Sequence, residues 1–222
     1  MNLSKMPFPK LTQSGVIAAA LATAPLGQAE LLTNPGFEDG NATPDAWGFN
    51  DGGSSGGATG VYLTLGDNAD ASEVRSGENS VAVLNGGPSN ARWFTAGGAG
   101  VNTFNLEAGT TYQVSVWMLR ENLDDNDFGR VSISGLDALD GSSVNIGGNT
   151  VGFEQVSFSF TPDQDYENRR ILLSYNNDGD DLLPADTGRI IFDDASVTAV
   201  PEPGAMSLLS LGGLLLATRR RS

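Results

Sequence analysis

The sequence predicts an all-β domain, a two-sheet β-sandwich of jelly-roll type, with a short apolar segment at each end of the chain. Three observations carry this prediction. Apolar and polar residues alternate with a period of two in many short stretches. Gly, Asn, Asp and Pro separate these stretches, as they separate strands. No convincing helical pattern lies between Glu30 and Ala199. Eight or nine short strands in one domain favour a sandwich.

The first 29 residues have the pattern of a secretory signal peptide. Lys5 and Lys10 precede an apolar run at 16–26, and Gly27-Gln28-Ala29 places small residues at the two positions that a signal peptidase reads. A basic region, a short apolar region and a small-x-small site are the parts of such a signal. An amphipathic N-terminal helix is the alternative, but three prolines would interrupt it. We expect cleavage after residue 29 and a mature domain at 30–199.

Several strands follow in the predicted domain, and four of them have clear patterns. The clearest places Tyr112, Val114, Val116 and Met118 on one face and Gln113, Ser115 and Trp117 on the other. The others are 153–160, 171–175 and a last strand at 190–197. Weaker candidates span 61–65, 80–84, 91–95, 101–106 and 130–134. The glycine-rich stretch at 51–60 is expected to be a long loop.

The chain ends in Val-Pro-Glu-Pro, an apolar run at 205–218 and three arginines. A helix of that length spans roughly 21 Å at about 1.5 Å per residue, whereas a bilayer core is about 30 Å thick. The run is therefore short for a permanent transmembrane anchor. A sorting segment that a processing enzyme recognises and then removes fits this length better.

Composition restricts the chemistry of the domain. The chain has 12 basic and 27 acidic residues, and both of its lysines and three of its arginines lie in the terminal segments, so the predicted domain contains arginine but no lysine. So acidic a body repels nucleic acid and anionic lipid, which excludes both as expected partners. Without Cys or His there is no disulfide and no histidine-assisted nucleophile. A metal would need oxygen ligands, which suits calcium.

Several landmarks of the body resemble the galactose-binding-like jelly rolls of many carbohydrate-binding modules. They occur in the order of that family. They are LLTNPGFEDG at 31–40 followed by Trp47, Ser76-Gly77 before the strand at 80–84, GTTY at 109–112 before VSVWMLR, Phe153 before VSFSFTP, and IIFDDASVT at 190–198. Trp47 is interpreted as a core residue or a lid on the first loop. The resemblance covers nearly all of 31–198 and implies a jelly-roll fold, but it does not identify a ligand.

The tail at 200–222 resembles a PEP-CTERM sorting signal. Its parts are Pro201-Glu202-Pro203, the apolar segment, and Arg219-Arg220-Arg221. The resemblance implies export in a Gram-negative bacterium, a transient stay in the inner membrane through a short hydrophobic sorting helix, and an exosortase-type processing enzyme as a partner. The arginines would stay on the cytoplasmic side. The mature protein would then reach the cell surface or the extracellular matrix.

A structural calcium site is also implied by the jelly-roll resemblance. Many such domains share a calcium ion between an acid after the first strand and an acid in the last strand, and Glu38 and Asp193 match those positions. The alternative is that both are solvated turn residues. The acidic loops at 123–129 and 176–181 do not match the EF-hand pattern, and we interpret them as surface acidity.

Sugar binding would need an aromatic platform with hydrogen-bonding groups beside it. Trp117 is the first candidate, because the strand pattern turns it away from the core, beside Gln113. Trp93 follows the same logic, although Arg92 is the alternative outward residue in that strand. Tyr62 and Tyr175 are further candidates. The alternative for Trp117 is packing under a loop or against the other sheet.

Three classes of function remain from the sequence. The first is an exported, non-catalytic module that binds a polysaccharide or exopolysaccharide through a jelly-roll face. The second is a structural surface or matrix protein without a specific glycan ligand. The third is a glycosidase that uses two carboxylates, but no acidic residue sits in a recognisable catalytic motif, so we expect no enzyme.

Overall fold

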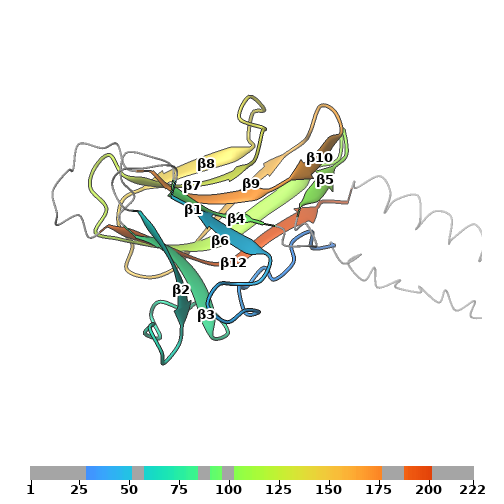
Figure 1. The fold of residues 1–222 in the computed structure, drawn as a ribbon. Coiled ribbons are helices and arrows are strands. Elements are labelled where there is room, and N and C mark those ends of the chain that lie inside the picture. Colours follow the sequence, from blue (N-terminus) through green and yellow to red (C-terminus); the bar gives the residue numbers. More distant parts are fainter. Residues whose placement is uncertain (1–28, 52–57, 85–90, 97–102, 177–187, 202–222) are drawn as a thin grey trace, which may run out of the picture.

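The protein folds as a β-sandwich, seen in a computed structural model that describes residues 29–51, 58–84, 91–96, 103–176 and 188–201. Figure 1 shows its strands stacked in layers, and the described residues contain no helix. In chain order the strands are β1 (Trp47–Asn50), β2 (Thr59–Thr64), β3 (Asn79–Leu84), β4 (Ala91–Thr95), β5 (Phe104–Leu106), β6 (Tyr112–Glu121), β7 (Phe128–Ile133), β8 (Ser143–Gly147), β9 (Glu154–Phe160), β10 (Tyr166–Arg169), β11 (Ile171–Asn176) and β12 (Arg189–Ala199). The predicted all-β jelly-roll class is confirmed.

Two five-stranded antiparallel sheets form the sandwich. We call them the β4 sheet, with strand order β1-β4-β11-β7-β8, and the β6 sheet, with strand order β2-β3-β12-β6-β9. A small pair, β10-β5, accompanies them. The non-consecutive order within each sheet means that most neighbouring strands are joined by connections that cross between the layers, as in Greek-key sandwiches.

The core lies between the two sheets and is built by strand alternation. Tyr112, Val114, Val116 and Met118 of β6 are buried in it, as the sequence predicts. Ile171 and Leu173 enter from the β4 sheet. Trp47 is also a core residue, with its ring centroid 4.6 Å from that of Phe37 and its indole N–H donating to the Asn34 carbonyl at 2.9 Å.

The outer face of the β6 sheet carries a second, smaller apolar cluster. Its buried members are Leu63, Ala82, Leu119 and Ile191. Ala69, from the segment that joins β2 to β3, and Phe153, which precedes β9, pack against them. This part of the outer face is therefore covered by the protein's own connecting segments. The outer face of the β4 sheet is the better candidate for a face that is open to an external ligand.

The two ends of the domain lie side by side. Glu30 forms an antiparallel bridge with Thr198, and the Leu31 N–H donates to the Val197 carbonyl at 2.9 Å. The Glu30 carboxylate also accepts hydrogen bonds from the Leu32 N–H at 3.0 Å and the Val197 N–H at 2.9 Å. The described chain therefore enters and leaves the sandwich at one end (Figure 1).

Candidate functional site

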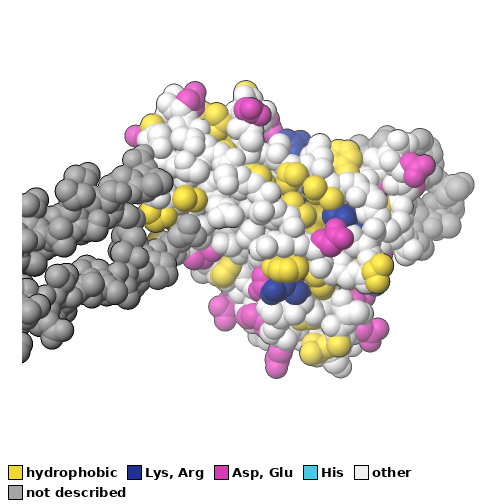
Figure 2. Space-filling view, turned by 180° about the vertical axis from the view of Figure 1, so that it is seen from behind, with side chains coloured by type: hydrophobic (Ala, Val, Ile, Leu, Met, Phe, Trp, Pro, Cys, Tyr) yellow, Lys and Arg dark blue, Asp and Glu magenta, His cyan; other side chains and the backbone are white. Residues whose placement is uncertain are grey.

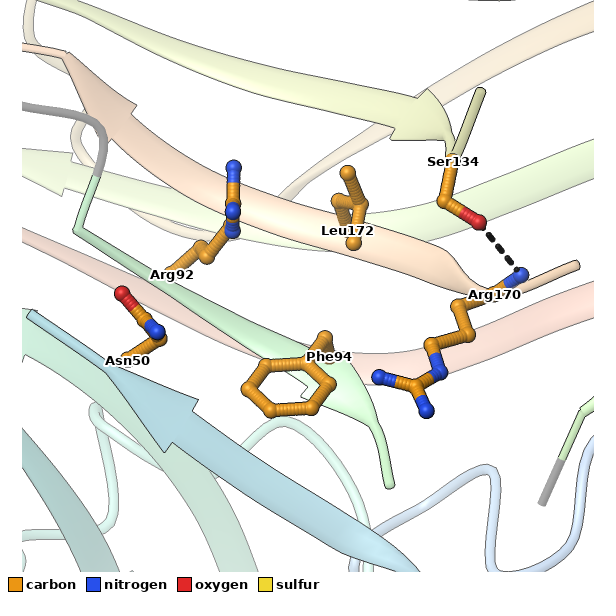
Figure 3. Close-up of a pocket in the computed structure, with 6 residues that line it drawn as sticks. All are labelled: Asn50, Arg92, Phe94, Ser134, Arg170 and Leu172. Atoms are coloured by element: carbon orange, nitrogen blue, oxygen red, sulfur yellow. Dashed lines mark hydrogen bonds between the residues drawn. The ribbon is translucent and has the colours of Figure 1, made fainter. Parts of the chain in front are cut away.

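A pocket opens on the outer face of the β4 sheet. Its volume is about 210 Å³. Figure 3 shows the six residues that line it, which are Asn50 from β1, Arg92 and Phe94 from β4, Ser134 just after β7, Arg170 between β10 and β11, and Leu172 from β11. Residues from four neighbouring segments thus meet on one outer face, where an external ligand can reach them.

Strand alternation and register place these side chains together. In β4, Ala91, Trp93 and Thr95 are buried, so the residues between them face outward. Phe94 pairs with Leu172 of β11 on one side and with Gly48 of β1 on the other. Asn50 pairs with Arg92 in the same ladder.

The Phe94 ring lies over Gly48 because that position has no side chain. A Cβ atom at Gly48 would lie 3.2 Å from Phe94 Cζ and 2.8 Å from the Ala96 Cβ, closer than such contacts normally allow. An aromatic side chain beside a strand glycine can cover the exposed backbone. The result is a half-buried aromatic ring on the outer surface of the sheet.

Backbone contacts fix the end of the pocket that carries Arg170. The Arg170 N–H donates to Ser134 Oγ at 2.9 Å, and the Ser134 N–H donates to the Arg170 carbonyl at 2.9 Å. The guanidinium carbon of Arg170 lies 5.4 Å from the centroid of the Phe94 ring. A pocket supported by such paired contacts holds its side chains in defined positions.

The arginines of the domain divide into two groups. Four form salt bridges: Arg75 with Asp194, Arg120 with Glu154, Arg130 with Asp137, and Arg189 with Glu73 and Glu121. Among the described residues, Arg92, Arg169 and Arg170 form none. Arg92 and Arg170 line the pocket, and Arg169 donates to the Ser134 carbonyl at 3.2 Å beside it.

The surface charge of the rest of the molecule is mainly negative. Figure 2 shows one face on which acidic side chains lie mostly around the periphery, whereas apolar side chains gather nearer the middle beside basic ones. The whole chain carries a formal net charge of −15. The pocket has two arginines and no acidic lining residue, so its charge is opposite in sign to that of the molecule as a whole.

Three of the predicted platform residues are instead core residues, and the prediction for them is wrong. Trp93 is 2% exposed, and its indole N–H donates to the Ala82 carbonyl at 2.8 Å. Tyr62 donates its hydroxyl to the Phe37 carbonyl at 2.7 Å, and burial, followed by the charge of Glu38, raises its pKa. Tyr175 is fully buried, with its hydroxyl on Asp127. None of these rings presents a face to solvent.

Trp117 lies on an outer face, as predicted, but on the β6 sheet. Its ring is half-buried under the guanidinium of Arg75, whose central carbon is 3.9 Å from the ring centroid. Arg75 in turn pairs with Asp194. Gln113 is exposed on the same strand, four residues away. The alternative of packing under a loop therefore describes Trp117 better than an open platform does.

Glu38 and Asp193, the predicted calcium ligands, hold the same short segment before β3. Asp193 accepts hydrogen bonds from the Arg75 N–H at 2.9 Å and the Ser76 N–H at 3.2 Å. The Glu38 carboxylate accepts from the Glu78 N–H at 3.0 Å and the Asn79 N–H at 3.3 Å. Two distant acids thus bind opposite ends of residues 75–79.

The donors around these two carboxylates are N–H groups, whereas calcium takes six to eight oxygen ligands. A carboxylate has about four lone-pair sites, so the N–H contacts occupy part of the capacity that a cation would use. Within the described ranges, no three acidic side chains gather in an arrangement that could hold a metal ion. Calcium at Glu38 and Asp193 stays a prediction.

The pocket-lining residues that the sequence did not point to are Phe94, Leu172, Asn50, Ser134 and Arg170. The signal for one of them was present in β4, where Arg92 was the alternative outward residue. If Arg92 faces outward, Phe94 must do so as well, because side chains alternate. The contribution of β1 and of Ser134 depends on strand order, which local patterns do not reveal.

Solved structures support the fold. An arabinose-bound GH51 α-L-arabinofuranosidase, MgGH51, matches with a TM-score of 0.55 and 17% identity over 78% of this chain, but this covers only 26% of that enzyme. A Stig cyclase, Fisc from Fischerella sp. TAU, matches with a TM-score of 0.54 and 15% identity, covering 79% of this chain and 99% of the cyclase. At these identities the likeness shows the fold alone.

Carbohydrate-binding modules are among the neighbours in structure. TmCBM61, solved with β-1,4-galactotriose, has a TM-score of 0.46 and 18% identity over 78% of this chain and 99% of its own length. No curated protein matches the sequence.

The C-terminal segment has a sequence match of its own. Residues 199–221 match the PEP-CTERM protein-sorting motif, which confirms the interpretation of Pro201, Glu202, Pro203, Arg219, Arg220 and Arg221. All of these except Pro201 lie outside the described residues, as does the predicted signal peptide through residue 28. The described part of the chain forms no helix long and apolar enough to span a bilayer. The chain is thus a jelly-roll protein with a C-terminal PEP-CTERM motif, exported by a Gram-negative bacterium and sorted to its surface or surroundings.

Proposed function

We propose that the protein is a non-catalytic polysaccharide-binding protein of the cell surface or extracellular matrix, and that its binding face is the outer face of the β4 sheet. An exosortase-type enzyme would process its tail. The observation that carries the proposal is the Phe94 ring, which lies over Gly48 beside polar side chains in an open pocket.

The chemistry of the pocket suits a sugar chain. A pyranose ring has apolar C–H faces that stack on an aromatic ring and hydroxyl groups that need hydrogen-bond partners. Phe94 supplies the ring, and Asn50, Arg92 and Ser134 supply polar groups around it. The opposite outer face is less suitable, because the Arg75 guanidinium lies 3.9 Å from the centroid of the Trp117 ring, closer than the 5.4 Å between the Arg170 guanidinium and the Phe94 ring.

The lining also supports binding without hydrolysis. Glycosidases generally place two carboxyl groups on either side of the scissile bond, one of them as a general acid. The six residues that line this pocket include no Asp and no Glu. We therefore expect the protein to bind its glycan and to release no reducing ends from it.

The test compares an aromatic residue on each outer face. Phe94→Ala should lower affinity for the polysaccharide that the wild-type protein binds by about tenfold, if a sugar stacked on the ring contributes as much as a stacked nucleobase, roughly 1–3 kcal/mol. Trp117→Ala, on the β6 sheet, should leave affinity unchanged. Affinity electrophoresis over a panel of neutral and acidic polysaccharides measures both.

Thermal unfolding of each variant shows whether the fold is intact, since only folded variants are compared. Loss of binding in Trp117→Ala with normal binding in Phe94→Ala would move the site to the β6 sheet. If the wild-type protein binds no polysaccharide of the panel, the proposal fails and a structural role without a glycan ligand takes its place.

A further inference from the structure

The charge of the pocket contrasts with that of the molecule. The chain has more than twice as many acidic as basic residues, 27 against 12. Even so, Arg92 and Arg170 both line the pocket, and neither pairs with any acid in the described part of the chain. The salt bridges of the described residues all involve arginines outside the pocket. From this arrangement we propose that the pocket takes an acidic polysaccharide, whose carboxylates pair with Arg92 and Arg170.

This inference rests on the proposed glycan-binding function and adds the class of glycan. Arginine binds carboxylates through two parallel N–H···O bonds, and such charge-assisted bonds are about twice as strong as neutral ones. A neutral sugar would need only hydrogen bonds of ordinary strength. Two unpaired guanidinium groups beside one aromatic ring match a sugar that carries a carboxylate.

The strand register gives the two arginines a spacing along the face. Ser174 of β11 pairs with Arg92, and Leu172 pairs with Phe94. Arg170 is four residues before Ser174 on the same chain segment, about 13 Å at the strand rise of about 3.3 Å per residue. Phe94 lies between these two positions. A sugar stacked on Phe94 would thus have a guanidinium on either side, within reach of neighbouring units of one glycan chain.

The backbone of Arg170 is held by hydrogen bonds, which fixes the point from which its side chain extends. These bonds run in both directions between Arg170 and Ser134, and the Arg170 guanidinium lies beside the Phe94 ring. Arg169, which does not line the pocket, donates to the Ser134 carbonyl at 3.2 Å from the same end. A preorganised cationic group loses less entropy when it binds an anion.

The acidic surface around the pocket would restrict which polyanions can bind. It repels polyanions in general, so an acidic chain gains affinity only if its carboxylates reach the arginines in the correct positions. Attraction at defined points together with repulsion elsewhere is how a protein discriminates among similar ligands. Nucleic acid is disfavoured for the same reason, because its evenly charged backbone would meet the acidic surface.

The experiment uses pairs of glycans that differ only in charge. The mature-length protein is titrated with polygalacturonate, alginate and hyaluronate and with the methyl ester of each, which keeps the backbone and removes the negative charge. We expect at least one acid form to bind about tenfold more tightly than its ester, since a hydrogen bond to a charged group contributes roughly 1.5–3 kcal/mol.

Two variants and a matched control locate the effect. Arg92→Gln and Arg170→Gln should each reduce the preference for the acid form several-fold and leave affinity for the ester nearly unchanged. Arg75→Gln lowers the net charge equally, but Arg75 lies over Trp117 on the outer face of the β6 sheet. The preference of this variant for the acid form should therefore equal that of the wild-type protein. Equal loss in all three variants would mean that net charge, not the pocket, sets the preference, and would overturn the inference.

The outcomes separate the two proposals. Equal affinity for acid and ester forms, unaffected by Arg92→Gln and Arg170→Gln, overturns the acidic-glycan inference and leaves glycan binding standing. Absence of binding to every acidic and neutral polysaccharide overturns both. Binding of polyaspartate or single-stranded DNA that is as tight as that of the best polyuronate would mark a general anion site and would also overturn the inference.

Discussion

Asp193 is a fully buried carboxylate. It accepts hydrogen bonds from three backbone N–H groups, those of Arg75, Ser76 and Asp194, the last at 2.7 Å. These bonds favour its charged form. Burial outweighs them, with the neighbouring charge of Asp194 acting in the same direction as burial, and raises the pKa of Asp193 to about 7.

This pKa makes stability depend on pH. The folded state retains the Asp193 proton over a range in which the unfolded chain, with a pKa near 3.8, has lost it. The free energy of unfolding should therefore fall as pH rises from about 4 to about 7, by a few kcal/mol for a shift of about three pKa units. Urea unfolding in a chelator across this range measures the slope.

The matched variant is Asp193→Asn, whose side chain stays neutral at every pH. It loses an acceptor oxygen, so its absolute stability is lower, and the pH dependence is the quantity to compare. The slope between pH 4 and 7 should be smaller in Asp193→Asn than in the wild-type protein. Parallel pH profiles would show that Asp193 is ionised throughout this range.

Single residues also show where the sequence stops being informative. Alternation in β4 allowed either Trp93 or Arg92 to face outward, and hydrophobicity favours the buried indole that the structure shows. Tyr62 and Tyr175 belonged to apolar strand faces, so their burial followed from the same pattern. Phe94 was harder to find, because an outward aromatic ring becomes a platform only next to Gly48 of another strand.

The segment between β2 and β3 does more than connect two strands. It covers part of the outer face of the β6 sheet, with Ala69 against the small apolar cluster and Arg75 over Trp117. Gly77 within it has a φ of +67°, and a Cβ there would lie 2.2 Å from Glu38 Oε1. The glycine is needed for both its backbone conformation and the close approach of Glu38.

Glu38 and Asp193, which bind this segment through hydrogen bonds, are the predicted calcium ligands. If Glu38 and Asp193 share a calcium ion, the unfolding temperature should rise with calcium concentration, because a ligand that binds only the folded state stabilises it. Differential scanning calorimetry in millimolar calcium and in chelator measures the shift, and Glu38→Gln should abolish it. Equal unfolding temperatures in the two conditions for the wild-type protein would remove calcium from the account.

Most strands could be predicted from the sequence, and the exceptions share a cause. The four clearly alternating segments, around 112–118, 153–160, 171–175 and 190–197, are strands of the structure, and the weaker candidates at 80–84 and 91–95 are strands as well. β1, β8 and β10 were missed. β8 and β10 have no fully buried residue, and β1 has one, Trp47, so tertiary pairing rather than local pattern determines these strands.

At the scale of the whole molecule, the domain begins where signal cleavage is predicted. Glu30 contacts Ser196, Val197 and Thr198. We expect the mature protein to start at Glu30, and to lack Arg219, Arg220 and Arg221 after processing of the tail. Intact-mass measurement and terminal peptide mapping of protein isolated from the cell surface or medium test both ends. A mature chain that is intact through Ser222 would contradict this expectation.

The position of β12 sets the order in which the protein can fold. β12 is the last strand among the described residues, yet it lies in the middle of its sheet, between β3 and β6. Until residues 189–199 are available, those two neighbours have an open gap between them, and non-local pairing of this kind is slow. The sorting motif begins at residue 199. A chain that emerges N-terminus first can therefore complete this sheet only when residues 189–199 have emerged. The sorting motif emerges directly after them, so the sheet closes at about the time when the motif becomes available for recognition.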